Sequence, residues 1–356
     1  MLFFKISNLF DTVAGYRSKL KIMNVSDELP AVLTDVPFMP SFYQLLIHDN
    51  RLVNMAPYIK KDKEWLDAIE PEVLEAITEE DGSIYVSTIG TNEFSSTGIF
   101  WNKELFEKAG ISKFPQNWSE FWDACELLKE HGITPLGLHT KGTAWAPMLL
   151  ATANLGTKES GVDFMKKKLP VSFNNPEGKQ FASILKKLFH YANENAIGTD
   201  FDQAYEDFFD GKVAMLPNGF WMIQQIDKTW QNKVGFSLFP NNISISSPDM
   251  SGWSIANSSD DNVIKGALAF MKFRALDAQK TKESNFQSEN SSQDPISEQY
   301  FTELKGNPQI IPNYQIQWSS VTQEAIEKGL PDLIEENISI EEFIKRMDEN
   351  TEQYTE

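Results

Sequence analysis

The sequence predicts an α/β fold arranged as two lobes. Its 356 residues exceed the size at which a single hydrophobic core usually stops growing, so two lobes are expected. Helix-like and strand-like segments alternate along the chain, which favours an α/β architecture. The composition, with 41% hydrophobic and 23% charged residues, is typical of a folded protein and not of a long disordered one.

Two helices are predicted in the first half of the chain from their capping residues. Residues 102–110 begin at an asparagine that can cap and end at a glycine. Residues 117–132 carry a capping pair, Asn117 with Glu120, followed by apolar side chains at 3.6-residue spacing. The tryptophans within this second stripe are therefore expected in the core.

Two more helices are predicted near the C-terminus. The pairs Ser320 with Gln323 and Ser339 with Glu342 both fit capping boxes. Amphipathic spacing after Ser339 supports the last of these helices.

Strands are predicted from short runs rich in β-branched and aromatic residues. These runs are residues 83–89, 97–101, 212–216 and 234–239. Residues 281–300 are polar and punctuated, which predicts a surface loop with short helical pieces.

Residues 208–221, "FFDGKVAMLPNGFW", place two bulky aromatics directly after a glycine. We predict a turn at Gly211 and Lys212, a buried strand at Val213, Ala214 and Met215, and a bend at Asn218 with Gly219. This bend would direct Phe220 inward and Trp221 outward.

Charge and cysteine content exclude several classes of protein. A net charge of −19 argues against nucleic acid as the main partner, because a phosphate backbone repels such a surface. The single cysteine, Cys125, excludes an internal disulfide and a cysteine-based zinc site, and its apolar stripe predicts a buried thiol. No apolar run approaches the roughly 20 residues that span a bilayer. The first residues lack a small-residue cleavage site, so no complete signal peptide is expected in this chain.

Motifs of reaction chemistry are missing from the sequence. It contains no G-x-S-x-G elbow, no G-x-x-x-x-G-K-[ST] loop and no G-x-G-x-x-G turn. None of its four histidines forms a pair with metal-site spacing. We therefore expect a protein that is not an enzyme and that uses no cofactor and no metal. Plentiful acidic residues leave a carboxylate pair for glycoside hydrolysis open as an alternative.

Four tryptophans stand beside turn signals and outside the helical stripes: Trp145, Trp221, Trp253 and Trp318. An aromatic ring at the end of a loop or strand can stack on the C–H face of a sugar. Each ring alone is also compatible with core packing. The four together favour a ligand-binding cleft.

Several ordered motifs resemble one known family. Residues 98–138 run from "GIFWNKELFEKAG" through a proline-tryptophan turn to "GITPLGL", and residues 208–221 read "F-DGK-AM---G-W". Residues 251–276 and the tail from Ile311 continue the series. In order and spacing the chain, from about Leu29 onward, is similar to bacterial extracellular solute-binding proteins of family 1, the sugar-binding components of ABC transporters that include maltose-binding protein.

The resemblance implies a periplasmic-binding-protein-like fold, with two α/β lobes joined by a hinge and ligand between them. The lobes would comprise 1–110 plus 256–310 and 111–255 plus 311–356, with crossings near 110–115, 253–257 and 308–313. Ala31 stands where the family has an aspartate, and only 28 residues precede this motif. The first lobe is therefore expected to lack its N-terminal strand and helix, as in a truncated or misassigned start or a diverged member.

The resemblance also implies a binding site and partners. The ligand-binding residues carried over are Trp221, Trp318, Trp145, Trp253, Asp35, Thr34, Thr91 and Asn92. The protein would be a monomer that closes on a carbohydrate and docks on an ABC-transporter membrane permease. It would act in the periplasm or at the extracellular face of the bacterial membrane, lipid-anchored in its full-length form. Two alternatives stay open: a carbohydrate-active enzyme with a cleft carboxylate pair, and a degenerate binding protein that no longer transports.

Overall fold

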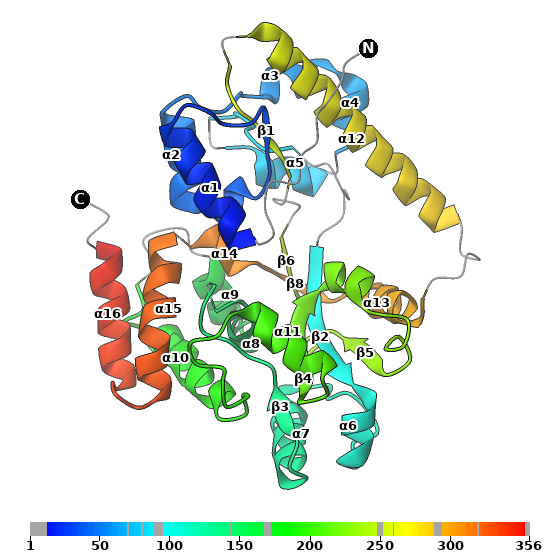
Figure 1. Cartoon of the computed structure of the whole chain (residues 1–356), viewed down its shortest axis with the longest axis vertical. Helices are drawn as coiled ribbons and strands as arrows, with labels where there is room; N and C mark the ends of the chain where they lie inside the picture. Colours follow the sequence, from blue (N-terminus) through cyan, green and yellow to red (C-terminus); the bar gives the residue numbers. More distant parts are fainter. Residues whose placement is uncertain are drawn as a thin grey trace. The chain divides into compact units, whose positions relative to one another are not determined.

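The protein is described by a computed structural model (Figure 1). The described residues are 13–69, 71–79, 81–87, 95–142, 144–166, 172–247, 252–258, 260–287, 294–318 and 320–352. The chain divides into two compact units, each made of two segments. Unit 1 is Met1–Phe94 with Ser247–Ser291, and unit 2 is Ser95–Ser246 with Ser292–Glu356.

Each of the two units is discontinuous, and the chain crosses between them at earlier positions than those named in the prediction. The crossings lie after Phe94, Ser246 and Ser291 instead of near 110–115, 253–257 and 308–313. The first difference has a direct cause. Strand β2, Ser95–Asn102, pairs along its length with strands of unit 2, so this strand and the helix after it belong to unit 2.

A mixed sheet forms the centre of unit 2. Its strands run in the order β3 (Thr134–Leu136), β4 (Val213–Gly219), β2, β6 (Ile243–Ser247) and β8 (Gln309–Pro312), and β5 (Val234–Ser237) also pairs with β2. Strand β2 is antiparallel to β4 and β5, whereas β3 is parallel to β4 and β6 is parallel to β8. The sequence predictions at 97–101, 212–216 and 234–239 are confirmed by β2, β4 and β5.

Strand β4 is buried at every residue. Met215 packs into one core cluster with residues of helix α8 (Trp145–Leu155), and Leu216 packs into another with Phe208 of helix α11 (Phe201–Phe209). A strand covered on both faces reads as a continuous apolar run, which explains "VAML" in the sequence. The strand therefore provides a rigid support for whatever follows Gly219.

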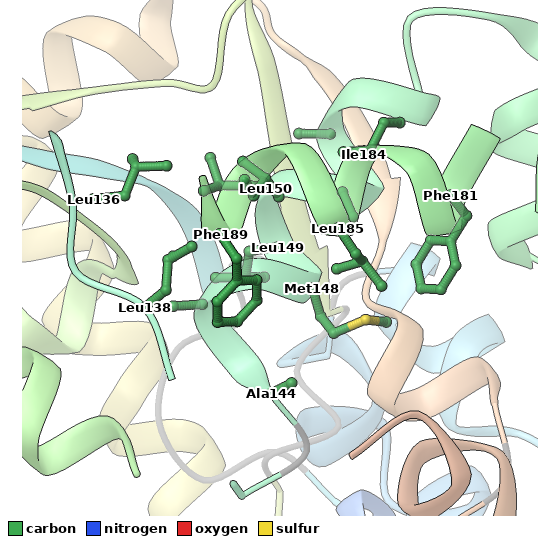
Figure 2. Packing of buried hydrophobic residues seen from close by; sticks show 14 of the residues in the cluster. Leu136, Leu138, Ala144, Met148, Leu149, Leu150, Phe181, Ile184, Leu185 and Phe189 are labelled. Carbon is green, nitrogen blue, oxygen red and sulfur yellow. The ribbon is translucent and has the colours of Figure 1, made fainter. Parts of the chain in front are cut away.

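The remaining helices of unit 2 are α6 (Lys103–Lys108), α7 (Trp118–Glu130), α9 (Glu159–Lys166), α10 (Pro176–Phe189), α13 (Pro295–Lys305), α14 (Tyr314–Gln317), α15 (Ser320–Ile334) and α16 (Ile340–Glu352). Figure 1 shows α15 and α16 lying side by side. The largest core cluster packs α8 against α10, and Figure 2 shows Met148 and Leu149 beside Leu185 and Phe189. Cys125 is fully buried there, as predicted.

Three of the predicted helix starts are confirmed by their capping bonds. Asn102 accepts a hydrogen bond from the Leu105 amide, and Asn117 accepts one from the Glu120 amide. The Ser339 hydroxyl accepts from the Glu342 amide at 3.1 Å. The buried side-chain amide of Gln323 donates to the carbonyl of Trp318 at 3.0 Å, and its pairing with Ser320 in a capping box stays a prediction.

Unit 1 contains α1 (Val13–Val25), β1 (Val32–Leu33), η1 (Val36–Phe38), α2 (Pro40–His48), α3 (Ala56–Lys61), α4 (Lys63–Asp67), α5 (Pro71–Ile77), β7 (Ser254–Ile255) and α12 (Asp261–Gln287). Strands β1 and β7 pair antiparallel. The predicted strand at 83–89 is wrong as far as it is described, because only isolated bridges form at Ile84 and Ser87. The segment 281–300, predicted as a surface loop with short helical pieces, is helical at both described ends, where α12 continues to Gln287 and α13 begins at Pro295, and 288–293 lie outside the described residues.

Across the described part of the chain, none of the helices combines the length and apolar character needed to cross a bilayer.

Candidate functional site

Two of the four turn-borne tryptophans meet on unit 2. Trp145 is the first residue of α8, and Trp221 is the second residue of a short 3₁₀ helix, η2 (Phe220–Gln225), that follows β4. Their ring centroids lie 6.0 Å apart with the planes inclined at 43°. Trp221 is 37% exposed and Trp145 is half-buried. We call these two side chains the aromatic pair.

Strand β4 delivers Trp221 to the aromatic pair. Gly219, the last residue of β4, faces Thr97 of β2 across the ladder, and its amide donates to the side-chain oxygen of Asn218 at 2.8 Å. Phe220 then packs against Tyr300, with ring centroids 6.1 Å apart. Phe220 is half-buried and Trp221 is 37% exposed, as expected from the sequence, whereas the orientation of Trp221 toward a ligand cleft stays a prediction. The predicted bend at Gly219 is wrong, since this residue is still extended, with φ −107° and ψ 174°.

His139 holds the loop that leads to Trp145. Its Nδ1 lies 2.8 Å from the carbonyl oxygen of Lys141, and the Ala146 amide donates to its Nε2 at 3.2 Å. A carbonyl only accepts, so Nδ1 carries the proton and Nε2 is the acceptor. Burial lowers the pKa of His139 to about 4, which keeps the ring neutral near neutral pH. The histidine thus bonds both sides of the loop and satisfies an amide in the first turn of α8.

The residue before Trp145 has an uncommon backbone conformation. Ala144 is completely buried and has φ +49°, in the left-handed region that alanine rarely adopts. Figure 2 shows Ala144 at the start of α8, next to the packed interior. Such a conformation persists only where the surroundings impose it, and it is concentrated at functional sites.

Further backbone contacts fix the outer side of the same loop. The Gly142 amide donates to the carboxylate of Glu327 on α15 at 3.1 Å. The Lys141 amide donates to the carbonyl of Thr199 at 3.0 Å, and Thr140 accepts from the Gly198 amide at 2.8 Å. The loop is therefore tied to two neighbouring segments as well as to its own histidine.

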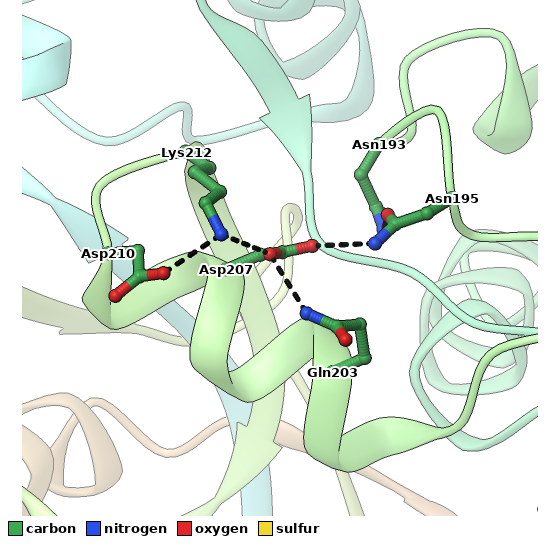
Figure 3. A network of polar contacts seen from close by, with 6 residues as sticks. All are labelled: Asn193, Asn195, Gln203, Asp207, Asp210 and Lys212. Atoms are coloured by element: carbon green, nitrogen blue, oxygen red, sulfur yellow. Dashed lines mark hydrogen bonds and ion pairs between the residues drawn. The ribbon is translucent and has the colours of Figure 1, made fainter.

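A buried carboxylate organises the segment beneath this loop. Asp207, on α11, is 3% exposed and accepts hydrogen bonds from Lys212 at 3.1 Å, Gln203 at 3.2 Å and Asn195 at 3.3 Å. Lys212 also pairs with Asp210 at 2.8 Å, and the two carboxylates raise the pKa of Lys212. Figure 3 shows these contacts converging on Asp207.

The network continues from Asp207 toward His139. Asn195 accepts from the side-chain amide of Asn193, and Asn193 accepts from the backbone amide of Leu138 at 2.9 Å. Leu138 directly precedes His139 in the chain. The "DGK" motif before β4 and the loop before α8 are therefore braced by one set of polar contacts, which is a structural role for that motif.

Trp318 does not belong to the site, and the prediction that it faces a ligand is wrong. Its side chain is completely buried within unit 2. The indole meets the rings of Phe164, Phe173 and Phe181 edge to face, with centroids 5.8, 5.4 and 5.6 Å away. Three phenylalanines from distant segments enclose the ring, so it is part of the core.

The other predicted site residues that are described lie in unit 1. Trp253 is half-buried and stacks on Phe270 of α12, with centroids 5.3 Å apart and planes at 25°. Asp35 forms an ion pair with Arg17 of α1, and the main chain of Thr34 bonds the hydroxyl of Tyr16. These contacts occupy Asp35 and the Thr34 backbone, and the ligand roles of all three residues stay predictions. Thr91 and Asn92 lie outside the described residues.

A surface hollow of about 730 Å³ in unit 1 contains none of the predicted site residues. Lys272 and Asp62 line it and form an ion pair at 2.7 Å, and Lys272 also pairs with Glu64 at 2.9 Å. Because none of the predicted ligand residues lines this hollow, we place the candidate site at the aromatic pair. Among the described residues, no group of three or more His, Cys, Asp or Glu side chains is arranged to hold a metal ion.

Sequence reasoning missed the residues that support the aromatic pair. His139 was judged only by metal-site spacing, and Gly219 was given a turn role. The signal for Gly219 was its position two residues before an exposed tryptophan. His139 and Glu327 have no local signal, because their partners are brought to them by the fold.

Comparison with known proteins identifies a family that matches most of the chain and curated relatives that match part of it. The sequence model of the family described as "Bacterial extracellular solute-binding protein" matches residues 12–287. The curated proteins that match include the sn-glycerol-3-phosphate-binding periplasmic protein UgpB of Brucella abortus (strain 2308), which is 30% identical over 133 residues. That alignment covers 34% of this chain and 29% of UgpB, so less than a third of the relative's length is matched.

Solved structures share the fold over nearly all of the chain. A chitin oligosaccharide binding protein has a TM-score of 0.74 and 21% identity, over 94% of this chain and 86% of that chain. A Streptococcus pneumoniae solute-binding protein in complex with the blood group A-trisaccharide has a TM-score of 0.74 and 23% identity, over 94% and 87% of the two chains. The predicted two-lobed α/β fold is confirmed by these likenesses. The family and the structural neighbours are binding proteins and not enzymes.

Proposed function

This chain belongs to the bacterial extracellular solute-binding proteins, and from that premise we propose that it binds a sugar or oligosaccharide on the aromatic pair of unit 2. The single observation that carries the proposal is the pair itself. Trp221 is 37% exposed although it follows a fully buried strand, and its ring lies 6.0 Å from that of Trp145.

The chemistry of the aromatic pair suits a carbohydrate. The face of an indole ring is apolar and electron-rich, so it packs against the C–H face of a pyranose ring. Two rings inclined at 43° offer adjoining faces from different elements. Two structural neighbours support this ligand class: the chitin oligosaccharide binding protein and the solute-binding protein in complex with the blood group A-trisaccharide.

By family membership the proposal extends to import. The ligand-bound protein would deliver its sugar to an ABC-transporter permease, outside the cytoplasm and held at the membrane by a lipid anchor. Delivery would require the ligand to shift the protein from an open to a closed state. A shift from about 1:99 to 99:1 requires the ligand to bind the closed state more tightly by roughly 5.5 kcal/mol. A few ring stacks and hydrogen bonds to hydroxyls supply energy of this order.

Calorimetric titration against a panel of ligands tests the proposal. The panel contains neutral monosaccharides, neutral oligosaccharides and sn-glycerol 3-phosphate, which the matched relatives are named for. We expect saturable binding of at least one neutral sugar. Failure of every sugar to bind a folded protein would refute the carbohydrate assignment, and binding of glycerol 3-phosphate alone would reassign the ligand class. Glycosidic cleavage of a bound oligosaccharide would instead favour the enzyme alternative.

A further inference from the structure

We infer that Gly219 and His139 are positioning residues that set the geometry of the aromatic pair before any ligand arrives. The inference rests on the proposed function, because the pair is taken to be the ligand platform. Each residue controls one ring. The main chain of Gly219 supports the indole of Trp221, and His139 fixes the loop that precedes Trp145.

Gly219 is required by the space above it and not by its backbone conformation. Its φ of −107° and ψ of 174° are ordinary extended values that any residue adopts. A methyl group on its Cα would lie 2.2 Å from both Cη2 and Cζ3 of Trp221 and 2.6 Å from Cε3. Carbon atoms this close repel each other strongly, so either the indole or the main chain would have to move. The indole therefore lies directly against the main chain of Gly219.

The main chain under the ring is the rigid partner in this contact. Gly219 is paired with Thr97 of β2, and its amide is bonded to the buried Asn218 side chain. Trp221, in contrast, is 37% exposed. A side chain added at position 219 would consequently displace the ring and leave the strand in place.

His139 acts on Trp145 through the backbone on either side of it. The histidine bonds the Lys141 carbonyl at 2.8 Å and the Ala146 amide at 3.2 Å, and the loop between them contains Ala144 with φ +49°. Phe201 packs its ring edge to face with His139, with centroids 5.8 Å apart. Without these two hydrogen bonds, Ala144 can return to a negative φ, which reorients the first residue of α8.

Together, Gly219 and His139 hold both rings of the aromatic pair in their binding geometry before a ligand arrives. Binding to a preformed site avoids the entropy lost when side chains are ordered by the ligand, so geometry set in advance appears as affinity. Loosening either ring should lower affinity without removing either indole. This result separates positioning from direct contact.

Circular dichroism of the coupled indoles provides a readout that needs no ligand. Two close, inclined indoles couple their transitions, and the wild-type spectrum minus that of Trp221→Phe isolates the signal of the aromatic pair. The second close pair, Trp118 with Trp122 at 5.8 Å, is unchanged in this difference and cancels. In Gly219→Ala we expect loss of the isolated signal, about tenfold weaker sugar binding and an almost unchanged melting temperature.

Gly235→Ala is the matched control for the glycine. Gly235 also lies under a tryptophan, with its added methyl 2.4 Å from Cε2 of Trp101, but that ring packs against both Phe106 and Phe114. Gly235→Ala should lower the melting temperature and keep both the pair signal and the affinity. Retention of the pair signal and affinity in Gly219→Ala would overturn the role of Gly219.

The histidine is tested by a loss and a rescue. His139→Leu removes both hydrogen bonds at similar volume, and we expect the pair signal to vanish and affinity to fall about tenfold. His139→Gln places an acceptor near the Nε2 position and should recover most of the pair signal and most of the affinity. The control is His131→Leu, because the His131 ring also bonds a carbonyl, that of Leu127 at 2.9 Å, but at the exposed end of α7. This control should change neither readout.

The outcomes separate this inference from the proposed function. If His139→Leu keeps the pair signal, or if His139→Gln behaves like His139→Leu, the positioning role of His139 is refuted. If the pair signal responds as expected but no sugar binds the wild-type protein, positioning stands and the carbohydrate assignment fails.

Discussion

Trp221 and Trp318 both follow turn signals in the sequence, and the structure gives them opposite environments. Trp221 is 37% exposed beside Trp145, whereas Trp318 is completely buried among three phenylalanines. The difference arises from what precedes each ring. Trp221 leaves a rigid strand through a glycine that seats the indole outward, and Trp318 follows α14 into a gap lined by α9 and α10. A turn places an aromatic at the end of an element, and packing decides which way it faces.

Replacing each tryptophan by alanine should give the largest contrast. Trp318→Ala removes a buried indole and leaves a cavity, so the free energy of unfolding should fall by about 3 to 5 kcal/mol. Trp221→Ala should cost about 1 kcal/mol or less, because the ring is partly solvated and its support is backbone. Urea unfolding of both variants measures this. Equal losses would show that Trp221 is a core residue, contrary to the assignment.

Acidification should destabilise the Trp145 side of the site through His139. The pKa of this histidine is about 4 in the folded protein against 6.5 for the free side chain. As pH falls from 6.5 to 4, the unfolded chain binds a proton that the native ring does not, so stability decreases over this range. Protonation of His139 in the unfolded chain should lower the free energy of unfolding by about 3 kcal/mol over this range.

The His139 contribution is isolated by comparing wild-type protein with His139→Leu in urea unfolding at several pH values. The wild-type curve should lose more stability on acidification than the variant, because carboxylates titrate in both. Parallel pH profiles would contradict a neutral buried His139.

Substitution of Trp221 should weaken sugar binding more than substitution of Trp318, which is the opposite of their order in stability. Trp221→Ala should weaken sugar binding about thirtyfold, which corresponds to the roughly 2 kcal/mol of an aromatic hot spot. Trp318→Phe keeps an aromatic in the core and should leave affinity within about twofold at a temperature where the variant is folded. Calorimetry on the two variants decides the matter. A greater loss of affinity in Trp318→Phe would place the ligand elsewhere.

The smallest effect is expected for Trp145→Phe. Phenylalanine keeps an aromatic face at the start of α8 but presents less of it, so affinity should fall about threefold. The same variant should abolish the circular dichroism signal of the aromatic pair. A loss as large as that of Trp221→Ala would show that Trp145 is the main contact and Trp221 the supporting one.

Local features of the fold were predicted from the sequence better than the site was. The caps at Asn102, Asn117 and Ser339 were correct because a cap is decided by residues within one turn. The strand predicted at 83–89 was wrong because strand formation requires a partner, and the described part of this run makes only single bridges.

The unit boundaries and the site depend on contacts between distant segments. The predicted first crossing differs from the observed one because β2 pairs with β4 and β5 of unit 2, which lie more than 100 residues later in the chain. Trp145 and Trp221 were both among the candidates named from the sequence, but their pairing was not foreseen. His139 could not be recognised, because its importance lies in an amide and a carbonyl whose positions follow from the fold.

A crystal structure of the protein with its best-binding sugar tests the central claim most directly. The account predicts a pyranose ring packed against the exposed face of Trp221 and in contact with Trp145, while the indole of Trp318 keeps its contacts with Phe164, Phe173 and Phe181. Sugar bound at a position that touches neither Trp145 nor Trp221 would contradict it.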